Sequence, residues 1–133
     1  MFGLFNYGKK GKRLHEEGKY IEAIKNFDKA IEGDPYEFIN WYFRGCSKYF
    51  LEQYEEAIDD FDKFIKDYPE DSSTRSFRGR CKYFLKRYEK AIKDFDKAIK
   101  LNSKEPYSFY FRGLSKRSLG KYDMAIKDFY KAI

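Results

Sequence analysis

The sequence predicts an all-α fold, and three observations lead to this prediction. Apolar residues recur at steps of three and four, which is the spacing of one face of an α-helix. The chain has no valine and a single threonine, whereas β-sheets normally depend on β-branched residues. Its 133 residues are 38% charged and 21% aromatic, and the aromatic side chains supply enough apolar surface for one folded domain over residues 1–133.

A repeat of 34 residues divides this domain into four units, residues 4–37, 38–71, 72–105 and 106–133. Alanine, glycine, tyrosine, isoleucine and phenylalanine each recur at this interval. They are Ala23, Ala57, Ala91 and Ala125; Gly11, Gly45, Gly79 and Gly113; Tyr20, Tyr54, Tyr88 and Tyr122; Ile24, Ile58, Ile92 and Ile126; and Phe27, Phe61, Phe95 and Phe129. A fixed period of this length indicates stacked supersecondary units that bury one another's apolar faces.

Each unit is predicted to hold two helices, as the second unit illustrates. Its first helix runs from Ile39 to about Leu51 and includes Gly45. Its second helix carries one apolar stripe, Tyr54, Ala57, Ile58, Phe61, Phe64 and Ile65. The charged residues between these positions are expected to face solvent, and they are Glu55, Glu56, Asp59, Asp60 and Lys63.

Prolines mark two of the boundaries between units, at residues 34–35 and 68–69, because proline cannot continue a helix. The third boundary has Ser103 at the proline position and Pro106 three residues later, so we expect a turn of a different shape there. Gly45 and its equivalents are expected to let the two helices of a unit approach closely.

These residues resemble the tetratricopeptide repeat. In the second unit the matching residues are Trp41, Gly45, Tyr54, Ala57, Phe61 and Pro69. Two positions depart from the pattern, since Arg75 replaces the first bulky residue of the third unit and Phe64 replaces a small one. The resemblance implies an α–α superhelix (solenoid) of antiparallel helix pairs. It also implies a protein–protein interaction scaffold that binds a peptide or protein segment in a concave groove lined by the first helices.

No set of residues typical of an enzyme emerges from the sequence. His15 is the single histidine, and we interpret it as a partly exposed helix residue. Cys46 and Cys81 are too few for a disulfide framework and are expected to be thiols. We therefore predict a protein that is not an enzyme, with no catalytic residue, no cofactor, no metal and no small-molecule substrate.

Tyrosine and arginine gather at first-helix positions that should face the groove, and both residue types are favoured at binding hot spots. The predicted peptide-binding residues are Tyr42, Tyr49, Arg80, Tyr83, Tyr107, Tyr110 and Arg117. For Phe50 and Phe84 we favour packing between neighbouring helices. In the chaperone-tail binders of the family, Lys, Asn and Arg clamp a terminal carboxylate. Arg80 alone matches that clamp here, so we do not expect this ligand.

The net charge of +6 is unevenly distributed. Residues 38–71 hold 4 basic and 9 acidic side chains, and residues 72–105 hold 11 basic and 4 acidic ones. The basic half favours an acidic ligand segment. It also leaves nucleic-acid binding through the third and fourth repeats as the alternative function, because aromatic and basic residues alternate there. The basic residues concerned are Arg75, Arg78, Arg80, Lys82, Lys86 and Arg87.

The cellular location is predicted from two missing signals. No apolar run approaches the ~20 residues of a membrane span, and the first residues lack the apolar stretch of a signal peptide. We therefore expect a cytoplasmic protein with no membrane partner.

The C-terminal helix of the fourth unit is more apolar than its equivalents. Tyr130 replaces an aspartate, and Ile126, Tyr130 and Ile133 form one stripe. Because repeat arrays need polar caps, we expect an unfinished array. Two alternatives follow, a fragment of a longer repeat protein or a chain that self-associates through this end, head to tail or symmetrically.

Overall fold

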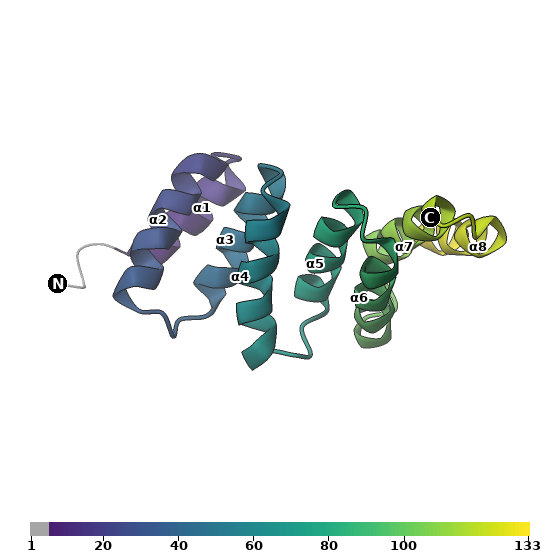
Figure 1. Cartoon of the computed structure of the whole chain (residues 1–133). Helices are drawn as coiled ribbons and strands as arrows, with labels where there is room; N and C mark the ends of the chain where they lie inside the picture. Colours follow the sequence, from purple (N-terminus) through teal and green to yellow (C-terminus); the bar gives the residue numbers. More distant parts are fainter. Residues whose placement is uncertain (1–5) are drawn as a thin grey trace. The chain divides into compact units, whose positions relative to one another are not determined.

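A computed structural model describes residues 6–133 and shows eight α-helices and no strand among them (Figure 1). They are α1 (Tyr7–Glu16), α2 (Tyr20–Gly33), α3 (Ile39–Phe50), α4 (Tyr54–Asp67), α5 (Ser72–Phe84), α6 (Tyr88–Leu101), α7 (Pro106–Ser118) and α8 (Tyr122–Ala132). The predicted all-α class is confirmed, and eight helices fit four repeats. The start of the first repeat, including Leu4 and Phe5, lies outside the described residues.

The helices fall into two compact bodies of two repeats each. They are called the first unit, which ends at Asp67, and the second unit, which begins at Tyr68. In the first unit, α1 packs on α2, α3 packs on α4, and α2 contacts α3. In the second unit, α5 packs on α6, α7 packs on α8, and α6 contacts α7. Each unit therefore contains two helix pairs, joined through the second helix of one pair and the first helix of the next.

Each helix pair is closed at one point by a glycine against a phenylalanine ring. A Cβ atom at Gly45 would lie 2.7 Å from Cε1 of Phe61, and one at Gly79 would lie 2.7 Å from Cε1 of Phe95. The rings of Phe61 and Phe95 are completely buried. The glycine is therefore needed for the close approach of the two helices, as the sequence predicted.

The sequence departs from the repeat pattern at Arg75 and at the third boundary, and the structure shows contacts at both that are similar to those of the other repeats. The indole of Trp41 donates a hydrogen bond to the Pro35 carbonyl at 3.0 Å, and Nε of Arg75 donates one to the Pro69 carbonyl at 3.3 Å. The expectation of a different third turn is wrong at Asn102. Its φ and ψ of −147° and 97° nearly equal those of Asp34, and both side chains accept a hydrogen bond from the backbone two residues on.

The turn inside each helix pair has one residue with positive φ. This residue is Gly18 or Gly120 in the outer repeats, but Glu52 and Lys86 adopt φ of 62° and 64° at the equivalent positions. A left-handed conformation costs a residue with a side chain roughly 1–2 kcal/mol. The two inner turns therefore carry strain that the two outer turns do not.

We predict that Lys86→Gly raises the free energy of unfolding by about 0.5–1 kcal/mol, because relief of the strain exceeds the added entropy of an unfolded glycine. Urea denaturation followed by circular dichroism measures this change. Gly120→Ala is the matched control and should lower stability. Equal midpoints for Lys86→Gly and the parent chain would contradict the prediction.

We also predict that Ala57→Leu or Ala91→Leu destabilises the chain by roughly 1–3 kcal/mol, because both alanines are completely buried and extra methylenes overpack the helix contact. Thermal melting of each variant measures the loss. Glu55→Leu, on the exposed side of α4, should change stability far less. An unchanged melting temperature for both alanine variants would mean that the close contact lies elsewhere.

Candidate functional site

A buried carboxylate in the second helix of a pair is held by two cations from the first helix. Arg112 donates to both oxygens of Asp128 at 2.9 and 2.7 Å, and Lys116 lies 3.0 Å from the same carboxylate. Arg112 also bonds Asp96 of the preceding pair at 2.8 Å. The guanidinium of Arg112 thus joins α7 to α8 and to α6.

The same arrangement recurs in the other unit. Arg44 donates to both oxygens of Asp60 and also bonds Asp28 at 2.8 Å. Asp60 was expected to face solvent, and this expectation is wrong because the residue is 2% exposed. The apolar spacing of α4 did not show that Arg44 and Lys48 of α3 would cover this carboxylate.

These contacts change the pKa values of the groups in the fourth repeat. Burial alone would raise the pKa of the Asp128 carboxyl, but hydrogen bonds and the charges of Arg112 and Lys116 outweigh burial and lower it. Burial likewise opposes the charged form of Arg112, and its bonds to Asp128 and Asp96 raise its pKa above the ordinary value. Both groups therefore stay ionised in the folded chain at neutral pH.

We predict that the Asp128 contact makes stability depend on pH. Its pKa is lower when folded, so its contribution is complete above the ordinary value of 3.8 and is lost as pH falls through the folded pKa. Asp128→Asn should therefore destabilise the chain at pH 7, and its difference from the parent should shrink below pH 3.8. Urea denaturation at several pH values tests this. The exposed Asp123→Asn is the control, and a difference independent of pH would contradict the prediction.

Arg80 is the cation of the second unit that lies among aromatic rings. Its guanidinium carbon is 4.5 Å from the ring centre of Phe77, 4.6 Å from that of Tyr107 and 5.3 Å from that of Phe111. Nη2 donates a long bond of 3.4 Å to Ser76, and the buried Nε donates none. Arg80 is half-buried, so the rings of α5 and α7 fix a positive charge at the surface between these two helices.

The predicted site residues differ in their surroundings. In the second unit Tyr107 is 57% and Tyr110 45% exposed, while Tyr83 is half-buried against Phe111 with ring centres 5.7 Å apart. Arg117 is exposed. The structure therefore brings the charge of Arg80 together with the exposed ring of Tyr107.

The predicted residues of the first unit are packed more deeply. Tyr42 and Tyr49 are both half-buried. The ring centre of Tyr42 lies 5.5 Å from that of Phe64 on α4, and the ring centre of Tyr49 lies 5.9 Å from that of Tyr54. Phe50 stacks on Tyr20 of α2 at 5.0 Å, which agrees with packing between neighbouring helices. These rings contribute to the fold of the unit as well as to its surface.

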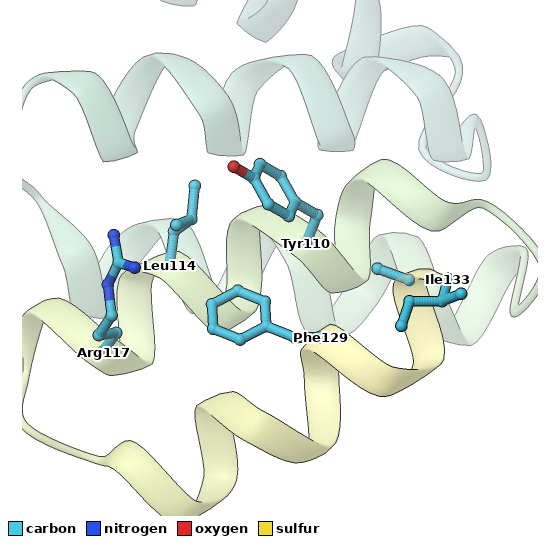
Figure 2. A pocket seen from close by; sticks show the side chains of 6 residues that line it. Tyr110, Leu114, Arg117, Phe129 and Ile133 are labelled. Atoms are coloured by element: carbon cyan, nitrogen blue, oxygen red, sulfur yellow. The ribbon is translucent and has the colours of Figure 1, made fainter.

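A cavity of about 430 Å³ lies between α7 and α8 (Figure 2). Its lining residues are Tyr110, Leu114, Arg117, Phe129, Ala132 and Ile133. Figure 2 shows Tyr110, Leu114 and Arg117 on α7, with Phe129 on α8 and Ile133 directly after its end. Two predicted peptide-binding residues, Tyr110 and Arg117, therefore line a space that Arg80 does not reach. Phe77, Phe111 and Phe129 were not assigned to a site from the sequence, although the recurrence of Phe77 and Phe111 at the position of Phe43 was a usable signal.

His15 has a structural environment. Its Nδ1 lies 2.8 Å from the hydroxyl of Ser47, and its ring is edge-on to Tyr20 and Phe43. Burial lowers the pKa of His15, and the nearby charge of Glu16 offsets this only in part. A neutral, half-buried imidazole between α1 and α3 agrees with a residue that supports helix packing.

Cys46 and Cys81 are both buried. Within residues 6–133 there is no cluster of histidine, cysteine or carboxylate side chains suited to a metal ion. None of the described helices combines the length and apolar character needed to cross a membrane.

The helix pairs and their 34-residue spacing define an all-α repeat protein. The family model described as tetratricopeptide repeat matches residues 42–106 and 82–133, which together make up more than half of the chain. The chain belongs to the tetratricopeptide repeat family. A search of curated protein sequences finds no match.

Solved structures with the same fold include two of MamA. MamA 41-end from Desulfovibrio magneticus RS-1 has a TM-score of 0.90 and 23% identity, covering 95% of this chain and 71% of that one. A further crystal structure of MamA has a TM-score of 0.86 and 24% identity, covering 96% and 69%. The first TPR of Spaghetti (RPAP3), bound to the HSP90 peptide SRMEEVD, has a TM-score of 0.81 and 23% identity, covering 86% and 90%. At these identities the likeness concerns the fold.

Proposed function

We propose that this chain is a protein–protein interaction scaffold that binds an acidic peptide or protein segment on the surface of its first helices. The observation that carries the proposal is Arg80, whose charge is fixed by three aromatic rings beside the exposed Tyr107. An arginine guanidinium pairs with a carboxylate through two parallel hydrogen bonds. Tyr107 offers an adjoining apolar face for a neighbouring ligand side chain.

Membership of the tetratricopeptide repeat family supports this role, and so does the structurally similar first TPR of Spaghetti (RPAP3), which is bound to a peptide. We also propose that the four repeats act as one domain, residues 1–133, that performs no catalysis. Tyr42, Tyr49, Tyr83, Tyr110 and Arg117 remain proposed contacts for the longer ligand segment.

Nucleic-acid binding is less favoured because four of the six basic residues named for it already contact other groups of the protein. Arg78 and Lys82 both bond the buried carboxylate of Asp94, at 2.7 and 2.8 Å. Arg75 donates to a backbone carbonyl, and Arg80 lies among rings. Phosphate binding would require these cations to exchange their present partners for the nucleic-acid backbone.

Binding of fluorescent octapeptides that contain two glutamates and one leucine, measured by anisotropy, tests the proposal. Arg80→Gln should weaken the tightest of these peptides at least tenfold, and Tyr107→Ala should weaken it by a similar factor. Lys90→Gln removes one exposed charge from α6 and is the matched control.

Matched peptides with glutamine in place of glutamate complete this experiment. The Arg80→Gln chain should no longer distinguish the two peptide sets. Equal binding of both sets to the parent chain would contradict the acidic-ligand proposal. Stronger binding of a single-stranded oligonucleotide, with a steep loss as salt rises, would favour the alternative function instead.

A further inference from the structure

The arrangement of Arg80 over an aromatic ring recurs in the first unit, two repeats earlier in the sequence. Lys12 of α1 occupies the position of Arg80, and Phe43 of α3 occupies that of Phe111. The Nζ atom of Lys12 lies 5.4 Å from the ring centre of Phe43, and the guanidinium carbon of Arg80 lies 5.3 Å from that of Phe111. Each unit therefore holds a cation of one first helix over an aromatic ring of the next first helix.

The charge of Lys12 is not used by the fold. The cations of α3 that face α4, Arg44 and Lys48, are both bound by Asp60 at 2.8 and 3.0 Å. Lys12 is exposed, and among residues 6–133 no carboxylate forms an ion pair with it. Its ammonium group is thus placed by the ring of Phe43 and can accept a carboxylate from a ligand.

An exposed apolar side chain accompanies the cation in each unit. Tyr107, which contacts Arg80, is 57% exposed, and Ile39 at the equivalent position of α3 is 46% exposed. Ile39 and Phe43 are four residues apart, so they are neighbours on one face of α3. The surface around Lys12 therefore combines a positive charge with an apolar contact for an adjoining ligand residue.

His15 lies one turn after Lys12 on the same side of α1 and also contacts Phe43, with ring centres 5.9 Å apart. Other groups around the imidazole are Glu16 of α1, Tyr20 of α2, and Ser47 and Phe50 of α3. A negative charge bound at Lys12 would therefore come close to the imidazole of His15.

The charges of α1 favour a ligand group with a single negative charge. Glu16 follows Lys12 by four residues and is exposed on the same side of the helix. Lysine before glutamate is the less favourable order for an ion pair along a helix, and the two side chains do not pair. Glu16 instead repels an arriving anion, and it repels a doubly charged phosphate more than a carboxylate. Aspartate or glutamate is thus the ligand residue that fits.

We propose that the first unit has its own binding site for an acidic residue of a partner protein, formed by Lys12, Phe43 and Ile39. An aspartate or glutamate pairs with Lys12, and an apolar residue next to it packs on Ile39. This inference rests on the proposed function for its ligand chemistry. It adds a second site to the one around Arg80, so that the chain can bind two acidic segments.

The two sites should differ in strength. Arg80 is half-buried among three rings, whereas Lys12 is exposed and contacts one ring. We therefore expect the Lys12 site to fill only above the peptide concentrations that titrate the Arg80 site. Within that lower range the Arg80→Gln chain still treats the glutamate and glutamine peptides alike.

Nuclear magnetic resonance of His15 tests the proposal, because the chain has a single histidine. The probes are the glutamate and glutamine octapeptides, unlabelled and in excess over the Arg80→Gln chain. The glutamate peptides should shift the imidazole signal saturably and raise the pKa of His15, because a nearby carboxylate favours the charged imidazole. The glutamine peptides should do neither.

Variants of α1 in the Arg80→Gln chain give the specific controls. Lys12→Gln should weaken the binding of glutamate peptides about fivefold, which is the upper end expected for an exposed ion pair, and Lys12→Arg should retain it. Glu16→Gln should strengthen binding about twofold because it removes a like charge. Lys25→Gln removes an exposed cation of α2 and should leave binding unchanged. Circular dichroism confirms that each variant keeps its helices.

Three results would overturn the proposal. The first is equal binding of glutamate and glutamine peptides to the Arg80→Gln chain at every concentration. The second is binding that Lys12→Gln does not weaken. The third is tighter binding of peptides with phosphoserine in place of glutamate, because the site would then select a phosphate. None of these results alters the anisotropy of the parent chain, which decides the proposed function separately.

Discussion

The contact between a glycine of the first helix and a phenylalanine of the second determines the geometry of every helix pair. Each of the four glycines leaves less than 3 Å between an added Cβ atom and the ring, so the ring packs directly on the backbone of the first helix. The ring then extends past its own pair, and in Phe27 and Phe95 it stacks on the next first helix. One contact thus sets both the spacing within a pair and the way the next pair packs.

The Arg–Asp contacts explain why a basic chain need not be a nucleic-acid binder. The three buried aspartates Asp60, Asp94 and Asp128 each bind one arginine and one lysine of the partner helix. These six cations are used to join helices, and Arg44 and Arg112 also reach the preceding pair. The first repeat lacks this arrangement because Lys10, Leu14 and Asn26 stand at the corresponding positions. The net charge therefore overstates the positive charge available to a ligand.

The sequence predicted the fold more fully than the site. A predicted first helix from Ile39 to about Leu51 agrees with α3, Ile39–Phe50, because apolar spacing and proline both act locally. The same spacing assigned Asp60 to solvent, since a stripe shows which face a residue occupies and not which cations cover it. Arg80 and Tyr107 were predicted from their first-helix positions. The cage around Arg80 was not, because it requires rings from two helices that are distant in sequence.

The positions whose residue type differs between the four repeats lie apart from the positions that form the contacts within helix pairs. Positions that keep one residue type in all four repeats, such as the glycine and phenylalanine of each pair, form the contacts within helix pairs. The position of Arg80 instead holds Lys12, Cys46 and Leu114 in the other repeats, and that of Arg117 holds His15, Tyr49 and Tyr83. Side chains at these positions can change without altering the glycine–phenylalanine contact. These first-helix positions can thus differ from one repeat to the next while the same packing holds every pair together.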